Sequence, residues 1–270
     1  MKYLTIILLL TLSCCKTDEI LESVQIDIYP AFDDYSSFHI NVQSDTTKIE
    51  FTKFKMFENI DEALSGKKTV LSTSIISSNK TPELFNATKS FRDDGKRNDG
   101  YTDGITSTVI KNYQNKSDTS SIHVPFRDKN PNHYVYLDKL FDLLEETDSY
   151  DEQVYFETIK SYFDYGLPIK QTNSDPITYR VWGALTTNEE KSLKILTESI
   201  NETEFVIFDF RNYQGMGSIL YHEFIQLNKR NKNIYYLYDK EINADLEYIG
   251  NNKVYKTIDK ILAEYKKGYR

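Results

Sequence analysis

Alternating apolar and polar residues dominate the first half of the chain. Between residues 24 and 126 the apolar side chains recur at every second position, most clearly at 24–29, 38–42 and 49–54. A period of two turns one row of side chains toward a core and the other toward water, as in a half-buried strand. This half is therefore predicted to form an antiparallel sheet or meander. Further strands are predicted at 70–76, 105–110 and 122–126, and a long loop with local structure is predicted at 77–104.

The period changes near Asn132. Apolar residues recur there at helical spacing, first over 135–144 and again over 151–165. Gly166 and Pro168 follow and supply a stop signal for the second helix. Two consecutive helices are therefore predicted between the first half of the chain and its last third.

Strands and helices alternate in the last third. Strands are predicted at 177–182, 205–208, 234–238 and 253–255. Helices are predicted after Asn188, after Gly215-Met216-Gly217-Ser218, and at 258–265. This alternation favours a partly parallel sheet with helical cover. The predicted class is α+β, with a β-rich region at 24–128 and a helical and α/β region with a mixed sheet at 129–270. A boundary at 128–132 and one composite domain are the two alternatives.

The first sixteen residues have the pattern of a targeting segment. Lys2 precedes an apolar run of ten residues from Tyr3 to Leu12. That run is shorter than the roughly 20 residues that span a bilayer as a helix. It is typical of the apolar region of a secretory signal peptide, which we therefore predict at residues 1–14.

The end of this segment resembles the lipobox of bacterial lipoproteins. The resemblance lies in Leu12-Ser13-Cys14-Cys15. It implies acylation of a cysteine, removal of the residues before it, and attachment to the membrane through N-terminal acyl chains. Cys15 is the predicted lipidation site, because Leu12 is at the favoured third position upstream; Cys14, with Thr11 at that position, is the alternative.

Residues 15–23 are predicted to form the lipidated tether. Lys16-Thr17-Asp18-Glu19 resembles the charged patch that sends some Gram-negative lipoproteins to the outer face of the outer membrane, and a solvated linker is the alternative. The predicted location is the cell envelope, as an outer-membrane lipoprotein facing the periplasm or the surface.

Charge and cysteine content exclude several function classes. The chain has 41 acidic and 33 basic side chains, a net charge of −8, and no basic cluster, which argues against nucleic-acid binding. Both cysteines lie in the lipobox. The folded body therefore has no disulfide, cysteine nucleophile, cysteine-ligated zinc or iron–sulfur cluster. No cofactor and no metal are predicted.

Three segments resemble known functional motifs, but each lacks a residue that its motif requires. His222-Glu223 begins a zincin motif, but Gln226 occupies the place of the second histidine. Gly215 and Gly217 begin a dinucleotide fingerprint, but Leu220 replaces the third glycine. The Asp-Gly-rich stretch 93–104 fits no register of a calcium loop and is interpreted as turns.

One candidate pocket remains. Asp209 follows the apolar strand 205–208, and ligand sites in open α/β sheets cluster beyond that edge. Asp209, Arg211, Asn212 and Ser218 are the candidate binding residues. The alternative is that Asp209 and Asn212 form the turn into the next helix.

Residues 177–265 resemble a STAS domain, the fold of anti-sigma-factor antagonists. The resemblance lies in Trp182-Gly183-Ala184-Leu185-Thr186, in Val206-Ile207-Phe208-Asp209-Phe210, and in the turn 215–218. It implies an α/β architecture. The family's D-S-S-G phosphorylation segment is missing and the loop after Asp209 is shorter, so the resemblance does not imply that activity.

These observations lead to one functional hypothesis and two alternatives. The hypothesis is a non-enzymatic, membrane-anchored envelope lipoprotein whose body binds a protein or another envelope component. The first alternative is an envelope hydrolase with its site near Asp209 or in the 77–104 loop. The second is an immunity-type lipoprotein that neutralises a toxin.

Overall fold

The structure is a computed structural model, which describes residues 20–30, 33–42, 46–56, 66–93, 95–96, 104–185, 189–240, 244–250 and 253–268. The predicted signal peptide, Cys14, Cys15 and the tether up to residue 19 lie outside the described residues, as do residue 94 and residues 97–103 of the Asp-Gly-rich stretch. The last predicted tether residues, 21–23, belong to the first strand.

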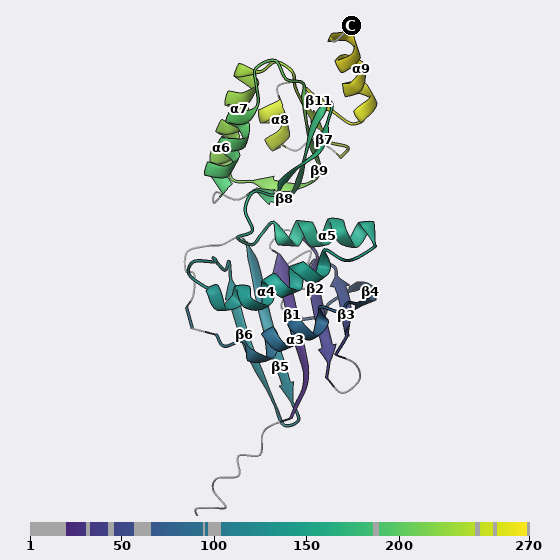
Figure 1. The fold of residues 1–270 in the computed structure, drawn as a ribbon, viewed down its shortest axis with the longest axis vertical. Coiled ribbons are helices and arrows are strands. Elements are labelled where there is room, and N and C mark those ends of the chain that lie inside the picture. Colours follow the sequence, from purple (N-terminus) through teal and green to yellow (C-terminus); the bar gives the residue numbers. More distant parts are fainter. Residues whose placement is uncertain are drawn as a thin grey trace, which may run out of the picture.

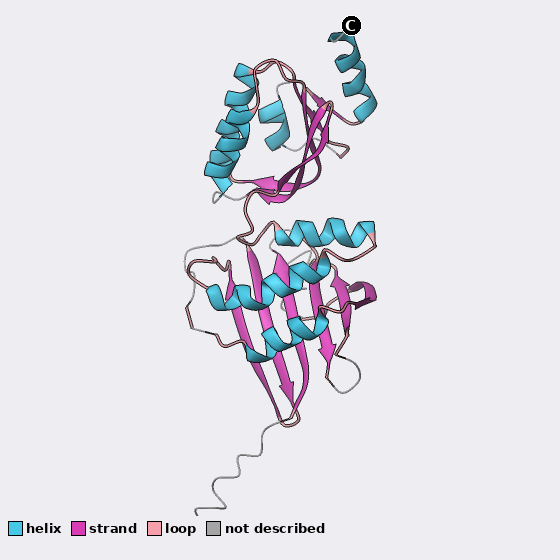
Figure 2. Ribbon diagram, in the orientation of Figure 1, coloured by secondary structure: helices cyan, strands magenta, loops and turns pink. Residues whose placement is uncertain are grey.

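The first half forms a six-stranded antiparallel sheet, here called sheet A (Figures 1 and 2). Its strands run in the spatial order β4-β3-β2-β1-β5-β6. Their bounds are β1 (Leu21–Pro30), β2 (Tyr35–Asn41), β3 (Lys48–Phe54), β4 (Val70–Ser77), β5 (Ile105–Tyr113) and β6 (Lys116–His123). The antiparallel sheet expected from the period of two is confirmed; β1 to β4 form a meander, and β5 pairs with β1 rather than with β4.

Three helices cover one face of sheet A (Figure 1): α3 (Thr81–Ser90), α4 (Pro131–Leu144) and α5 (Tyr150–Lys160). Pairing aligns Ile26 with Phe38 and Phe38 with Phe51, so alternate residues form a continuous apolar surface beneath the helices. The Phe156 ring of α5 lies 5.1 Å from the ring of Phe51 and 6.0 Å from that of Phe38. The core of this first unit is therefore aromatic and lies between sheet A and its helices.

The predicted loop at 77–104 contains α3. Leu84 and Ala87 of this helix are buried, but so are Thr81 and Thr88. The Thr88 hydroxyl donates to the carbonyl oxygen of Leu84 at 2.8 Å, which satisfies it inside the helix. Because threonine occupies two of the four buried positions, the helical period is not visible as an apolar pattern.

The last third forms a second, mixed sheet, called sheet B, in the order β11-β10-β9-β8-β7. β7 pairs antiparallel with β8, and the other pairs are parallel. The strands are β7 (Ile169–Ser174), β8 (Ile177–Leu185), β9 (Val206–Met216), β10 (Ile234–Leu237) and β11 (Val254–Tyr255). The predicted α+β class with a mixed C-terminal sheet is confirmed.

Helices cover the two faces of sheet B unequally. Helices α6 (Glu190–Ser199), α7 (Tyr221–Arg230) and α8 (Ala244–Gly250) share one apolar core with β8, β9 and β10. Helix α9 (Ile258–Gly268) packs on the opposite face through Ile261, against Ile207 and Leu237. Among the described residues, no helix combines the length and the apolar character needed to cross a membrane.

The two hydrophobic cores divide at a different place from the predicted boundary at 128–132. Helices α4 and α5 belong to the core of sheet A, which extends to Phe163, and the core of sheet B takes in Leu167 and Ile169. The change of period near Asn132 marks a change of secondary structure inside the first unit. The helices after it pack back on the preceding sheet.

The end of α5 meets β8 through a close backbone contact. The Ser161 hydroxyl donates to the carbonyl oxygen of Thr158 at 2.6 Å and accepts from the Ala184 amide at 3.0 Å. Gly183 has φ +52°, and a Cβ built there would lie 2.8 Å from the Thr158 carbonyl oxygen and 2.0 Å from Ser161 Oγ. This contact therefore requires glycine at position 183.

We expect Gly183→Ala to lower the free energy of unfolding by about 3 kcal/mol. Alanine is strained in the left-handed backbone conformation, and its methyl group would overpack the contact with Thr158 and Ser161. Gly166→Ala is the matched control, because Gly166 also has a positive φ (+84°) but nothing lies within 4 Å of its built Cβ. The control should lose only about 1–2 kcal/mol. Equal losses in denaturant unfolding would contradict the close contact.

Candidate functional site

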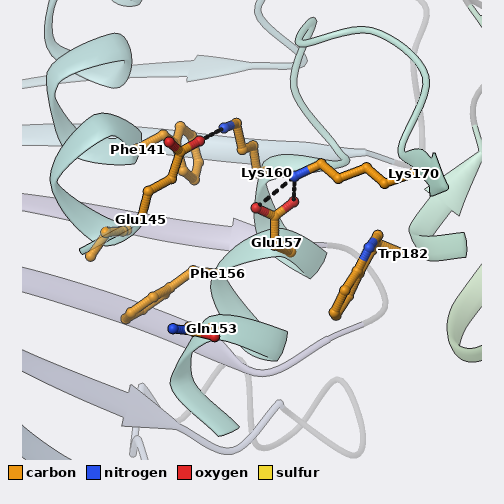
Figure 3. A pocket seen from close by; sticks show the side chains of 9 residues that line it. Phe141, Glu145, Gln153, Phe156, Glu157, Lys160, Lys170 and Trp182 are labelled. Atoms are coloured by element: carbon orange, nitrogen blue, oxygen red, sulfur yellow. Dashed lines mark hydrogen bonds and ion pairs between the residues drawn. The ribbon is translucent and has the colours of Figure 1, made fainter. Parts of the chain in front are cut away.

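A cleft lies where α4 and α5 of the first unit face β7 and β8 of the second (Figure 3). Its volume is about 250 Å³. The lining residues come from all four elements and from the turn after α4: Phe141, Leu144, Glu145, Gln153, Phe156, Glu157, Lys160, Lys170 and Trp182. The cleft therefore exists only because the two units are in contact.

The floor of the cleft is apolar and its outer wall is an indole. Phe141, Leu144 and Phe156 are buried in the core of the first unit, where their edges form the floor. Trp182 of β8, the single tryptophan of the chain, is half-buried on the other side (Figure 3). An aromatic ring in this position offers a flat apolar surface at low conformational cost.

Two ion pairs line the cleft between these surfaces. Lys160 Nζ lies 2.7 Å from Glu145 Oε1, and Lys170 Nζ lies 3.0 Å from both carboxylate oxygens of Glu157 (Figure 3). The hydrogen bond from Lys160 lowers the pKa of Glu145. The four formal charges cancel, so the cleft as a whole is polar but neutral.

Behind Trp182 lies a cluster of two arginines around one carboxylate. Asp209 is 2% exposed, and its carboxylate accepts from Arg211 at 2.7 and 2.8 Å and from Arg180 Nε at 3.2 Å. The Arg180 guanidinium carbon lies 5.4 Å from the centre of the Trp182 ring. Asp209 therefore positions Arg180, and Arg180 in turn supports the wall of the cleft.

Burial raises the pKa of Asp209, but the hydrogen bonds from Arg211 outweigh it and leave the pKa below its ordinary value. The pKa of Arg211 is raised by the same hydrogen bonds. A carboxylate whose pKa is lowered and whose oxygens are paired with two guanidinium groups is a poor general acid or base near neutral pH. The cluster is therefore suited to holding Trp182 in place.

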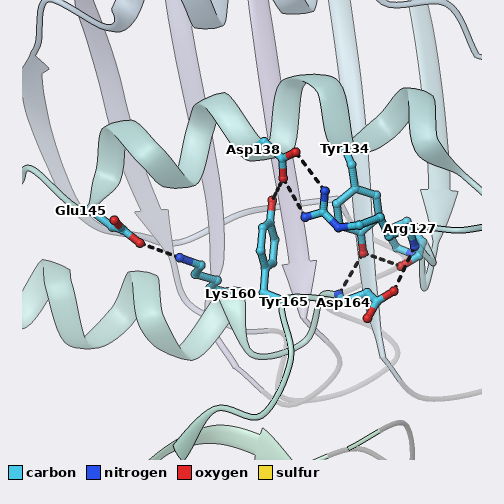
Figure 4. Close-up of polar contacts among 8 residues, drawn as sticks. Arg127, Tyr134, Asp138, Glu145, Lys160, Asp164 and Tyr165 are labelled. Carbon is cyan, nitrogen blue, oxygen red and sulfur yellow. Dashed lines mark hydrogen bonds and ion pairs between the residues drawn. The ribbon is translucent and has the colours of Figure 1, made fainter. Parts of the chain in front are cut away.

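The segment that leads from α5 into the second unit is fixed by Arg127 (Figure 4). The Arg127 guanidinium donates to both carboxylate oxygens of Asp138 at 2.8 and 2.9 Å, and the Tyr165 hydroxyl donates to the same carboxylate at 2.9 Å. The Asp164 amide donates to the Tyr134 hydroxyl at 2.8 Å. These bonds tie residues 164–165 to α4 and so limit how far the two walls of the cleft separate.

The structure brings together only two of the four candidate residues. Asp209 and Arg211 form the cluster just described. Asn212 lies further along β9 opposite Trp182, and Ser218 is exposed at the start of the short 3-10 helix Ser218–Leu220. No hydrogen bond or ion pair within the described part of the chain joins either residue to Asp209.

The prediction that Asp209 lies at the end of its strand is wrong. The strand does not end at Asp209, because β9 continues to Met216, and Asn212 is a strand residue rather than part of a turn. Gly215 is also inside the strand, and the next α-helix begins at Tyr221. The polar residues after Phe208 looked like a strand end, but β8 pairs with them as far as Met216.

Sequence reasoning missed the cleft itself. Along β8, part-exposed Arg180, Trp182 and Ala184 alternate with buried Val181, Gly183 and Leu185, but the predicted strand ended at Trp182. The other lining residues come from helices and a strand that are distant in sequence. No local pattern connects Glu157 with Lys170, because their distance depends on how the two units pack.

A second cavity of about 270 Å³ lies at the C-terminal end of α3 and is lined in part by Lys111. The Lys111 side chain is almost fully buried, and Nζ donates to the carbonyl oxygens of Phe91 at 2.6 Å and Lys89 at 3.2 Å. Burial lowers the pKa of Lys111. A cation that caps the last carbonyls of a helix has a structural role, which accounts for this lysine.

No protein-family model matches the chain, and no curated protein matches it. Two solved structures are similar to part of it. One, an uncharacterised protein from Shewanella loihica with a SpoIIAA-like fold, is 15% identical, with a TM-score of 0.27 over 36% of this chain and 89% of that one. The other, a sulfate transporter family protein from Wolinella succinogenes, is 20% identical, with a TM-score of 0.27 over 33% and 83%. The α+β class of this chain follows from its own two sheets and the helices that cover them.

We expect Asp209→Asn to destabilise the protein by about 2–3 kcal/mol at neutral pH, because two partly buried guanidinium groups lose their counter-charge. The pKa of Asp209 is lowered in the folded state, so its stabilisation is present above the unfolded value of about 3.9 and is lost as pH falls through the folded value. The stabilities of the two proteins in denaturant unfolding should therefore converge as pH falls through the lowered pKa of Asp209. The exposed Asp128→Asn should change stability by less than about 0.5 kcal/mol, and a similar loss there would contradict the assignment.

Proposed function

We propose that this chain is an envelope lipoprotein without catalytic activity, held at the membrane by acyl chains on Cys15, whose body binds an envelope component in the cleft between its two units. The lipobox residues support the anchor. The cleft supports the binding role, because it combines an apolar floor, an aromatic wall and polar groups in a concave surface.

The cleft is the observation that carries the binding role, and its chemistry favours binding over catalysis. Its carboxylates, Glu145 and Glu157, are both paired with lysines. The hydrogen bond from Lys160 lowers the pKa of Glu145, so this carboxylate remains ionised at neutral pH. The alternative hydrolase site was placed near Asp209. There the carboxylate forms ion pairs with Arg180 and Arg211 and is not available to a substrate.

The anchor is tested by metabolic labelling with a fatty-acid analogue. We expect the wild-type chain and Cys14→Ala to take up label and Cys15→Ala to lose it, because Leu12 is third upstream of Cys15. The Cys15→Ala protein should also leave the membrane fraction, since two or more acyl chains are needed for stable anchoring. Label that survives Cys15→Ala but not Cys14→Ala would reverse the assignment, and an unlabelled wild type would refute the anchor.

Binding is tested with the unanchored Cys15→Ala protein and washed envelope fragments. We expect the fragments to retain this protein, and Glu145→Gln or Lys170→Gln in the same background to reduce the retained fraction at least threefold. Both side chains are more than half exposed, so these changes should leave the fold intact. The matched control is Lys139→Gln, which removes an exposed ion pair from α4 outside the cleft. No retention, or equal retention by all variants, would contradict binding through the cleft.

A further inference from the structure

We propose that the cleft binds one ring of a neutral saccharide, with the ring's C–H face on Trp182 and its hydroxyl groups toward the lysines and glutamates. This inference rests on the proposed function and specifies the chemical class of the envelope component. It is carried by four properties of the cleft: its size, its charge balance, its remaining hydrogen-bonding capacity and the position of its single indole.

The size admits one small ring. The volume of about 250 Å³ lies below the roughly 300–1,000 Å³ of pockets that take drug-sized ligands. The floor does not deepen into the core, because Phe141 and Phe156 are packed against neighbouring rings of the first unit. A folded protein partner or a helix would therefore find no groove here, whereas a single pyranose ring is of suitable size.

The charge balance favours a neutral ligand. Lys160 is paired with Glu145, and Lys170 is paired with Glu157. An anion would lie beside a carboxylate of like charge, and a cation would lie beside an ammonium group of like charge. Hydroxyl groups meet no such repulsion, since they accept from ammonium N–H groups and donate to carboxylate oxygens while the ion pairs persist.

Hydrogen-bonding capacity remains after these pairs have formed. Among the described residues, Lys160 Nζ donates one hydrogen bond, to Glu145, although an ammonium group has three N–H donors. Gln153 also lines the cleft (Figure 3), and its Nε2 donates to the carbonyl oxygen of Thr147. The cleft therefore presents donors and acceptors close together, as a ring of hydroxyl groups requires.

The indole is held as a rigid surface. Arg180 lies behind the Trp182 ring and is itself bonded to buried Asp209. Trp182 Nε1 is buried and has no hydrogen-bond partner in the part of the chain that the structure describes. Buried N–H donors are nearly always paired in folded proteins, so Trp182 Nε1 is an unsatisfied donor in the wall of the cleft.

Intrinsic fluorescence tests the proposal directly, because Trp182 is the only tryptophan of the chain. The purified full-length protein in detergent is titrated with glucose, galactose and N-acetylglucosamine as neutral rings, and with glucosamine and glucuronic acid as charged rings of the same size. A short N-acetylglucosamine oligosaccharide distinguishes a polymer-derived ring from a free sugar. We expect at least one neutral ring to give a saturable change in Trp182 emission and to bind more tightly than its charged counterparts.

Variants that keep Trp182 locate the binding. Glu145→Gln and Lys170→Gln should each raise the apparent Kd about three- to tenfold, because each removes a charged hydrogen-bonding group from the cleft. Lys139→Gln should bind as the wild type does. The proposal is overturned if no neutral ring gives a saturable change, if a charged ring binds more tightly, or if the two cleft variants bind normally. If envelope fragments retain the protein while no saccharide binds, only the ligand class fails; if retention also fails, so does the proposed function.

Discussion

The arrangement of the protein depends on one buried electrostatic constraint, the pairing of Asp209 with Arg180 and Arg211. Sheet B has an apolar face beneath α6, α7 and α8, and an opposite face that bears charged side chains next to α5. The other unit partly shields the guanidinium groups on that face from water. Without a buried counter-charge, this loss of hydration would cost free energy of folding. Asp209 supplies this counter-charge, and Trp182 is held against Arg180 as a result.

The first unit contributes a rigid support for the charged residues that it turns toward the cleft, Glu145, Glu157 and Lys160. Its aromatic core extends from the strands of sheet A to α5, so the residues that α4 and α5 turn toward the cleft stand on well-packed helices. Arg127 and Tyr165 bind the same carboxylate of Asp138, which ties the connecting segment to α4. The cleft is thus formed by two independently packed bodies whose separation is limited by short polar contacts.

Periodic apolar patterns predicted the helices and strands that bury one regular face of apolar side chains. The strands β1, β2 and β3 and the helices α4 and α5 fall close to their predicted ranges. Elements with a polar or short buried surface were missed. Helix α3 buries threonines, β7 is an edge strand whose residues are largely exposed, and α8 has only seven residues. β7 is held by pairing with the adjacent strand β8, whereas α3 packs against α4 and α8 against α7.

The sequence by itself determined the α+β class and the absence of cysteine from the folded body. It also predicted the lipidation site. These follow from local periods, from composition and from a short linear motif that does not depend on folding. Only the tertiary structure decided that α4 and α5 belong to the first sheet, that Asp209 lies within a strand, and that Glu145, Glu157, Lys160, Lys170 and Trp182 line one cleft. Such proximity arises from packing between segments remote in sequence, which no local pattern records.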